Sequence, residues 1–269
     1  MLNSLTVVIA CKNRNEHIKY CVHSILQGDA VPKIAVVDFG SDMPVPLLDT
    51  DHIKVIRANR DTQVFHKARA LNIGIRMVST KFTCITDADQ IFAPNFFSIV
   101  WQQLNAAPKI FVRSKTHFLL GAGCTADPSE GETALSDFSQ AGITAEAIGN
   151  SYPSILAQAQ KVKPRGYGCC HGVATSWLLK VHGYDETYFG WGAEDRDLEV
   201  RAGYDGFRFV WANEYSSMVH LPHPKQGEYY DQARIEKNLA KYEALNSLTE
   251  DNHKKDSIVV NENTTWGAL

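Results

Sequence analysis

The sequence lacks a strong excess of charge of either sign. Its 269 residues include 27 Lys and Arg against 30 Asp and Glu, a formal net charge of -3. A nucleic-acid or anionic-membrane surface requires a dense positive face, so this balance argues against both kinds of partner. Hydrophobic residues make up 44% of the chain and charged residues 21%, a composition typical of a globular protein that buries a full core.

Long apolar runs are also absent, and the first residues carry no basic cluster. We therefore expect no signal peptide and no membrane span. The six cysteines form no CxxC pair, and several lie in strand-like runs: Cys11, Cys21, Cys84, Cys124, Cys169 and Cys170. This pattern predicts reduced, mostly buried thiols in a cytosolic protein and not a disulfide framework. The sequence shows no internal repeat, low-complexity tract or domain linker.

Apolar runs alternate with helical patterns in the first half of the chain. Strands are expected at residues 5–10, 33–38, 53–57, 81–86 and 109–113, because these runs are apolar and rich in β-branched side chains. Helices are expected from a cap at Asn15 to Leu26, over 65–78, and from Pro94 onward. The alternation predicts βαβ units and a mostly parallel sheet, which is an α/β fold.

Polar residues follow the predicted strands at the points where the strands end. Lys12 and Arg14 follow the first strand, Asp38 ends the second, and Asp87 and Asp89 follow the fourth. Ligands of parallel sheets bind beyond the carboxyl ends of the strands, so these three loops are expected to converge on one site. A turn-capping role is the alternative for Asp38.

The pattern weakens between residues 121 and 164, with helical hints at 134–139 and 155–162. We expect an excursion from the sheet that serves as a mobile lid or acceptor loop. Regular patterns return with an apolar stretch at 171–179, a turn at Gly183-Tyr184, strands at 207–211 and 216–220, and an amphipathic helix over 228–246. The last twenty or so residues are polar and are expected to be loosely held.

The most distinctive stretch is Phe189-Gly190-Trp191-Gly192-Ala193-Glu194-Asp195-Arg196-Asp197-Leu198-Glu199. Its acids open a helix that is expected to end at Gly203, and acids in a first turn complement the helix dipole. Asp197 and Arg201 have the spacing of an ordinary surface pair on a helix. Dipole and pairing do not account for the Gly-Trp-Gly lead-in. Glycines permit close approach of a ligand, and the tryptophan is well placed to line a flat, apolar ring.

Asp87 and Asp89 would share one face if their strand continued. A hard divalent cation binds carboxylate oxygens together with water or phosphate oxygens. His220 and His223 have an H-x-x-H spacing, but Pro222 would break a zinc-binding helix in its middle. We expect His220, at a strand end, to be a ligand suited to manganese and His223 to be a loop histidine.

Together these residues resemble a glycosyltransferase of the GT-A fold. The resemblance spans about Leu5 to Asn246, and its most specific parts are GWGAEDRDLEVR and FHKARALNIG. The first half is similar to glycosyltransferase family 2. The second half is similar to the galactosyltransferase C-terminal region of β-1,4-galactosyltransferases, polypeptide N-acetylgalactosaminyltransferases and bacterial chondroitin polymerases.

The resemblance implies a single Rossmann-like GT-A domain over residues 1–246, with a mostly parallel central sheet flanked by helices. A nucleotide-binding half would span residues 1–115, a variable excursion 121–165, and an acceptor and metal half 166–246. A tail would follow at 247–269.

The resemblance also implies an inverting, metal-dependent transfer from a UDP-sugar to a carbohydrate hydroxyl, with galactose or N-acetylgalactosamine favoured and Mn²⁺ or Mg²⁺ as the cofactor. Asp195 would be the general base. Substrates would contact a set of residues from both halves: Lys12, Arg14, Asp38, Phe65, Lys67, Asp87, Trp191, Gly192 and Glu194. Asp89, Asp87 and His220 would hold the metal. Core packing is the alternative for Phe65.

Two motifs depart from the family pattern. Asp38-Phe39-Gly40-Ser41 lacks the second acid of Asp-Asp-Gly-Ser, so Asp38 must act alone. Met218-Val219-His220 is one residue shorter than Met-x-x-His, which leaves Met218 open as a ligand.

Two other function classes would use similar residues. A nucleotidyltransferase or metal-dependent phosphohydrolase would use the same acids but gives Trp191 no role. A non-catalytic sugar-nucleotide or glycan-binding module would not need both Asp89 and Asp195.

Overall fold

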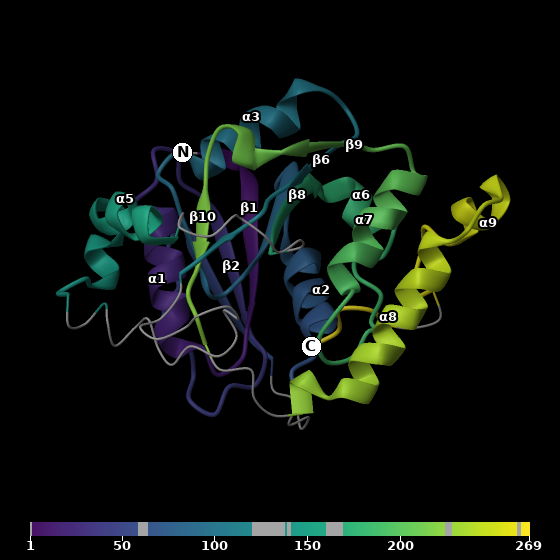
Figure 1. Cartoon of the computed structure of the whole chain (residues 1–269), viewed down its shortest axis with the longest axis horizontal. Helices are drawn as coiled ribbons and strands as arrows, with labels where there is room; N and C mark the ends of the chain where they lie inside the picture. The colour runs from purple at the N-terminus through teal and green to yellow at the C-terminus, as the bar shows by residue number, and fades with distance from the viewer. Residues whose placement is uncertain are drawn as a thin grey trace.

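A seven-stranded sheet in the order β3-β2-β1-β4-β8-β6-β9 forms the centre of the structure (Figure 1). The computed structural model describes residues 2–58, 64–119, 138, 141–159, 169–223, 228–262 and 265–269. The strands run over Leu2–Cys11 (β1), Pro32–Asp38 (β2), Ile53–Arg57 (β3), Phe82–Asp87 (β4), Gln90–Phe92 (β5), Ile110–Arg113 (β6), His117–Phe118 (β7), Cys170–Ala174 (β8), Arg208–Trp211 (β9) and Met218–His220 (β10).

The helices are Asn15–Leu26 (α1), Lys67–Met77 (α2), Phe96–Ala106 (α3), Ile148–Ala159 (α5), Thr175–Lys180 (α6), Glu194–Tyr204 (α7), Gln232–Asn246 (α8) and Asp251–Asp256 (α9). Short 3-10 turns occupy Ala145–Ala147 (η1), Ala212–Glu214 (η2) and Glu228–Tyr230 (η3). None of the described helices is both long enough and apolar enough to cross a membrane.

Most strands of the large sheet run parallel, as the alternating pattern predicts. β1 pairs in parallel with β2 and β4, β2 with β3, and β6 with β9. The exception is β8, which is antiparallel to both of its neighbours, β4 and β6. The expected α/β class with a mostly parallel central sheet is therefore confirmed.

Helices cover both faces of the large sheet because side chains alternate along each strand. On β1, Val7 and Ile9 pack in one apolar cluster with α1 and α3, while Val8 and Ala10 pack in a second cluster with α2, α6 and α7. Gly74 lets α2 approach the sheet, because a Cβ at this position would lie 2.5 Å from Val8 Cγ1. The most buried strands therefore read as continuous apolar runs in the sequence.

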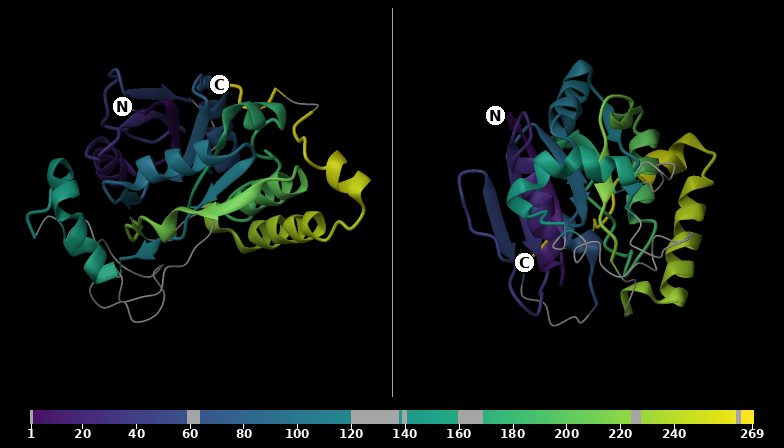
Figure 2. Two further views of the ribbon diagram at one scale, coloured as in Figure 1. Left: turned by 90° about the horizontal axis from the view of Figure 1, so that it is seen from above. Right: turned by 60° about the vertical axis from the view of Figure 1, so that its left-hand side comes forward.

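A second, three-stranded sheet has the order β5-β10-β7. Residues of α5 pack against it through a third apolar cluster that includes Ile91, Tyr152 and Val219. Figures 1 and 2 show α5 and α9 at opposite ends of the long axis of the molecule. Within the expected excursion at 121–164, residues 141–159 are therefore anchored. The mobility predicted for residues 121–137, 139–140 and 160–164 lies outside the described residues, as does the helical hint at 134–139 apart from Phe138. The helical hint at 155–162 falls on α5 as far as Ala159, and its last three residues lie outside the described part of the chain.

Several local expectations are wrong, each for a local reason. Asn15 does not cap α1: Arg14 occupies the cap, and the Asn15 amide donates to Met43 O and Pro44 O. The helix after Pro94 begins at Phe96.

The acidic helix α7 does not end at Gly203 but continues to Tyr204. The left-handed residue that follows it is Gly206, with φ +78°. A glycine therefore does terminate this region, but three residues later than expected.

The C-terminal tail is not loosely held, contrary to the expectation from its polarity. Val260 N donates to Val181 O at 3.3 Å, and Gly267 N donates to Glu186 Oε1 at 2.7 Å. The Trp266 ring stacks on His182 with centroids 5.6 Å apart. Specific hydrogen bonds and one aromatic contact anchor this tail, and a composition average does not reveal them.

Cys11, Cys21, Cys84, Cys169 and Cys170 are free thiols, and all but Cys169 are buried. This agrees with the expectation of reduced, mostly buried cysteines; Cys124 lies outside the described residues.

Asp197 and Arg201 form a buried ion pair and not the surface pair that their spacing suggests. Arg201 Nε donates to Asp197 Oδ2 at 2.7 Å, and both side chains are almost completely buried. The other guanidinium nitrogens donate to Gly183 O and Ile258 O. The pair therefore ties α7 to the preceding loop and to the tail.

Asp197→Asn should destabilise the fold by roughly 3 to 5 kcal/mol, because it leaves the Arg201 charge buried without its counter-ion. Urea denaturation followed by circular dichroism measures this change. Glu16→Gln is the control: it breaks the exposed Lys19–Glu16 pair and should cost less than about 1 kcal/mol. Equal losses in the two variants would contradict the structural role of the buried pair.

Candidate functional site

The predicted polar loops meet at one edge of the large sheet. Cys11 lies opposite Asp38 in the β1–β2 register, and Ala10 lies opposite Asp87 in the β1–β4 register. The ends of three adjacent parallel strands therefore bring their following loops together, as ligand sites of this fold class require.

One buried lysine, Lys67, forms ion pairs with three carboxylates at this edge. Lys67 Nζ lies 2.9 Å from Asp87 Oδ1, 3.2 Å from Glu194 Oε1 and 2.8 Å from Asp195 Oδ2. Lys67 comes from the first turn of α2, Asp87 from the end of β4, and the other two acids from the first turn of α7. We call these four residues the Lys67 cluster. With all four ionised it carries a net charge of −2, which favours binding of cations.

The Gly-Trp-Gly segment positions the two acids of α7. Gly190, Gly192 and Ala193 all have positive φ, at 77°, 109° and 72°. A Cβ on Gly190 would lie 3.1 Å from Tyr229 O, and that carbonyl also accepts a hydrogen bond from Trp191 N. This sharply turned backbone places the start of α7 inside the site, which accounts for the glycines.

Burial and mutual repulsion alter the pKa values of the clustered acids. Burial raises the pKa of Asp195 well above its usual value; Lys67 opposes this shift, and Glu194 and Asp87 reinforce it. Burial likewise raises the pKa of Asp87 to about 6, against the effect of Lys67. A carboxylate whose pKa is raised toward neutrality is suited to accept a proton.

Glu194 brings a further feature to the cluster. Its Oε1 faces Lys67, whereas Oε2 is buried and has no hydrogen-bond partner in the described part of the chain. A buried carboxylate oxygen without a donor is costly, so it marks a position where a ligand hydroxyl would be bound.

Asp89, His220 and His223 form a second group, whose ligand atoms all lie within 4.8 Å of one another. His220 Nε2 lies 3.6 Å from Asp89 Oδ1, and His223 Nε2 lies 3.1 Å from Asp89 Oδ2. Burial lowers the pKa of His220 to about 4, so its imidazole is neutral and keeps a lone pair at neutral pH. One carboxylate and two imidazoles fit a divalent transition ion such as manganese.

His223 lies in a loop, as expected, but this loop also brings its ring to Asp89. The chain turns at Pro222 beyond β10, and this turn returns His223 to Asp89 without any helix. Two contacts from α1 and its cap hold this turn. His17 Nε2 lies 3.2 Å from Pro222 O, and Arg14 Nη2 lies 3.0 Å from His223 Nδ1. Sequence spacing alone could not show this contact.

Two candidate metal ligands lie elsewhere. Asp87 points to Lys67 and lies outside the group of Asp89, His220 and His223. Met218 is completely buried in the apolar core, where it pairs with Phe92 across the small sheet. The structure therefore assembles Asp89 and His220 as expected, and it adds His223 in place of Asp87.

Asp38 is almost completely buried and organises its own loop. Its carboxylate accepts from Ser41 N at 3.0 Å and Val45 N at 3.2 Å, and it also pairs with Arg57. These contacts match the turn-capping alternative. The resemblance to the family implies a contact between Asp38 and the uracil edge of the donor. That contact stays a prediction, and it would use the lone-pair capacity that three donors leave on the carboxylate.

Lys12 and Phe65, which are also predicted to contact the substrates, lie close to the same loop. Lys12 Nζ donates to Gly40 O at 2.8 Å. The Phe65 ring contacts Phe39 and Tyr229, with centroids 6.1 and 5.4 Å apart. Phe65 therefore belongs to an aromatic group between the Asp38 loop and the segment that supports Trp191.

Aromatic rings border the Lys67 cluster. Trp191 keeps 42% of its surface exposed, and its ring lies 6.2 Å from that of Tyr230. Tyr229 contacts Tyr230 with centroids 5.0 Å apart. Sequence reasoning missed both tyrosines, because they lie almost forty residues from Trp191 in the chain. Partly exposed rings beside carboxylates are suited to contact a sugar.

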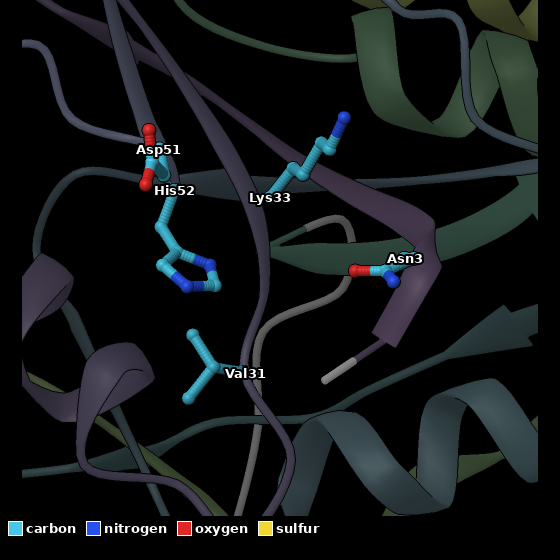
Figure 3. Close-up of a pocket in the computed structure, with 5 residues that line it drawn as sticks. All are labelled: Asn3, Val31, Lys33, Asp51 and His52. Atoms are coloured by element: carbon cyan, nitrogen blue, oxygen red, sulfur yellow. The ribbon is translucent and has the colours of Figure 1, made fainter.

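A separate hollow lies at the opposite edge of the large sheet (Figure 3). Its lining residues are Asn3, Val31, Lys33, Asp51 and His52, at or just before the starts of β1, β2 and β3. The acidic groups occupy the other ends of these strands, so this hollow is not part of the site.

Comparisons with known proteins find glycosyltransferases. The family described as Glycosyl transferase family 2 matches residues 6–119, and the family described as N-terminal domain of galactosyltransferase matches residues 158–224. Mouse Beta-1,4-galactosyltransferase 1 is 23% identical over 260 residues, covering 92% of this chain and 50% of that protein. The chain thus spans about half the length of this curated relative.

Solved structures show the same fold at low identity. GalNAc-T7 with UDP, GalNAc and Mn²⁺ has a TM-score of 0.62 at 13% identity, covering 96% of this chain and 55% of that one. The Pyrobaculum calidifontis mannosyltransferase PcManGT with GDP-Man and Mn²⁺ has a TM-score of 0.56 at 17% identity, covering 95% of this chain and 68% of that one. Staphylococcus aureus TarS 1-349 with UDP-GlcNAc has a TM-score of 0.56 at 15% identity, covering 95% of this chain and 70% of that one.

His220→Ala and His223→Ala should each weaken Mn²⁺ binding by about tenfold or more, because each removes one of three convergent donors. Calorimetric titration of the protein with MnCl₂ measures the affinity. His52→Ala, in the hollow of Figure 3, is the matched control and should bind Mn²⁺ like the unaltered protein. Unchanged affinity in His223→Ala would leave His220 and Asp89 as the protein's ligands.

Proposed function

We propose that this chain, a glycosyltransferase with the GT-A fold, transfers a sugar from a UDP-sugar to a carbohydrate hydroxyl with inversion at the anomeric carbon. The observation that carries the proposal is Asp195, a buried carboxylate of raised pKa at the start of α7 beside Trp191 and Lys67. A single displacement needs one base to remove the acceptor proton, and Asp195 has the environment of such a base.

The donor would lie across the carboxyl ends of β1, β2 and β4. Lys12, Asp38 and Phe65 line the side assigned to the nucleotide. Arg14 and Lys67 supply positive charge between that side and the acids, which suits a diphosphate. Galactose and N-acetylgalactosamine are the favoured sugars, because the galactosyltransferase family matches the second half of the chain.

A divalent ion would be held by Asp89, His220 and His223, whose donors fit manganese. When bound, such an ion neutralises negative charge on the diphosphate as it departs. The protein's part is to keep both imidazoles close to one carboxylate, and the turn at Pro222 does this. Asp87 would contact the donor sugar or ribose from the end of β4.

The acceptor would enter between the aromatic rings and the first turn of α7. Trp191 and Tyr230 offer apolar faces to a sugar ring, with Gly192 leaving room beside them. The unpaired Glu194 Oε2 would accept a hydrogen bond from an acceptor or donor hydroxyl. Asp195 would take the proton of the attacking hydroxyl as that oxygen bonds to the anomeric carbon and the diphosphate leaves.

The glycosyltransferase matches count against the two other function classes. A phosphohydrolase or nucleotidyltransferase would leave the aromatic border of Trp191 and Tyr230 without use. A binding module would have no need of a buried acid of raised pKa next to a separate metal-ligand group.

Asp195→Asn should lower transfer by roughly two to four orders of magnitude, because the amide keeps the shape of the side chain but cannot accept the proton. UDP release from UDP-galactose and UDP-N-acetylgalactosamine, with Mn²⁺ and a panel of acceptor sugars, measures the rate. Asp205→Asn, at the far end of the same helix, is the control and should retain activity. Near-normal transfer by Asp195→Asn, with the fold intact, would refute the proposed mechanism.

Glu194→Gln should raise the apparent KM for the acceptor, with a smaller fall in kcat. The amide keeps an oxygen acceptor but loses the charge next to Lys67, so binding suffers more than proton transfer. Steady-state kinetics with varied acceptor at saturating UDP-sugar separates the two parameters. An unchanged acceptor KM would remove Glu194 from the acceptor site.

A further inference from the structure

Two buried side chains behind Asp195 have no part in the mechanism above. The Tyr184 hydroxyl lies 3.2 Å from Asp195 Oδ1 and 2.6 Å from His171 Nε2. Tyr184 is fully buried and His171 is 1% exposed. The three side chains form one hydrogen-bonded chain that runs from the central sheet to the predicted base.

Tyr184 is held rigidly by its backbone. Its N–H donates to Asn72 Oδ1 at 2.8 Å, and its carbonyl accepts from Asn72 Nδ2 at 2.8 Å and Asn261 Nδ2 at 2.7 Å. Gly183 has φ +67°, and a Cβ there would lie 2.1 Å from Asn72 Oδ1. The loop therefore docks on α2 on one side and on the C-terminal tail on the other, which fixes the position of the hydroxyl.

His171 is held by the sheet. It lies on β8, opposite Ile85 of β4 and Arg113 of β6, and its ring stacks on Phe111 at 5.3 Å and 24°. Burial, with a smaller contribution from Lys67, lowers the pKa of His171 to about 3. The imidazole is therefore neutral at neutral pH. Its Nδ1 has no hydrogen-bond partner among the described residues.

The direction of this chain follows from counting protons. Tyr184 has one hydroxyl proton, and burial beside Asp195 raises its pKa, so the proton stays on the oxygen. If that proton pointed to His171, the Tyr184 and Asp195 oxygens would face each other with lone pairs only. If it points to Asp195, His171 carries its proton on Nε2 and donates it to the tyrosine oxygen. With Asp195 ionised, as a base must be, only the second arrangement gives every close contact a donor.

We propose that Tyr184, oriented by His171, is a positioning residue that donates a hydrogen bond to Asp195 Oδ1 and holds this carboxylate ionised and correctly oriented for proton transfer. The proposal rests on the proposed role of Asp195 as the base. His171 acts on Asp195 through Tyr184 and does not touch it directly.

The need for such a donor follows from the position of Lys67. The single ammonium is shared by Asp195, Asp87 and Glu194, and a donor diphosphate would compete for it. Tyr184 is neutral and fully enclosed, so its bond to Asp195 does not depend on what else Lys67 contacts. Besides Tyr184 and His171, the described ionisable groups that act on Asp195 or on its charged neighbours include Lys67 from α2, Asp87 from β4, Asp89 after it, Glu194 from α7, Cys169 before β8, and Tyr229 and Tyr230 from η3.

Tyr184→Phe tests the proposal because it removes the hydroxyl and keeps the ring. At pH 7, kcat should fall roughly 10- to 100-fold, while the KM for the UDP-sugar stays unchanged. The acidic limb of the pH–rate profile should move up by about one to two pH units, because the ionised form of Asp195 loses a donor. Raising the pH should then restore part of the rate, which a merely structural defect would not allow.

Matched variants complete this experiment. Tyr152→Phe removes another buried hydroxyl, bonded to Ser217, and should leave the profile unchanged. His171→Gln, whose amide can donate to Tyr184, should retain more activity than His171→Leu. If Asp195→Asn is inactive but folded Tyr184→Phe has an unchanged pH–rate profile, the positioning role of Tyr184 is overturned. The proposed function would still stand in that case. Activity in Asp195→Asn would instead refute the proposed function.

A measurement on the unaltered protein remains valid even if these variants fail to fold. Two-bond ¹H–¹⁵N spectra of histidine-labelled protein, assigned with His171→Gln or by through-bond correlation, report the tautomer of His171. The expected result is a neutral ring protonated on Nε2 that does not titrate between pH 5 and 8. A neutral ring protonated on Nδ1 would make Nε2 an acceptor, reverse the direction of the chain and overturn the proposal.

Discussion

The contact on which the site depends is the single ammonium of Lys67 among three carboxylates. Like charges at this separation repel strongly in a buried environment, so Asp87, Glu194 and Asp195 could not all approach without it. The cluster also joins α2, β4 and α7, three elements from distant parts of the chain. Burial is the main cause of the raised pKa of Asp195, and the neighbouring acids Glu194 and Asp87 add to it. The net negative charge of the cluster favours a cation at the adjacent edge.

The proposed mechanism assigns metal binding and proton transfer to two neighbouring groups. Asp89 with the two histidines is suited to a metal ion, and the Lys67 cluster is suited to proton transfer and to recognition of hydroxyls. Rigid supports stand behind each group: the turn at Pro222 behind the histidines, and the loop at Tyr184 behind Asp195. Since proton transfer depends on sub-ångström positioning, such supports bear on rate as directly as the reacting groups do.

Elements with strong local patterns could be predicted from the sequence. The apolar runs of β1 and β2 specify buried strands, and the structure agrees. The sequence marks Glu194 and Asp195 as candidates because the helix dipole and ion pairing do not account for the Gly-Trp-Gly segment before them. The environment of Asp197 could not be predicted, because an i,i+4 spacing is the same on a buried face and on an exposed one.

The sequence by itself determined the fold class, the edge of the sheet that carries the site, and most of the residues at that edge, because these follow from periodicity and from chemistry local to a motif. Only the tertiary structure decided which side chains meet. Asp87 turned to Lys67, His223 joined Asp89, and Tyr184 linked His171 to Asp195. Such contacts depend on how loops far apart in sequence pack against one another, and no local pattern records that packing.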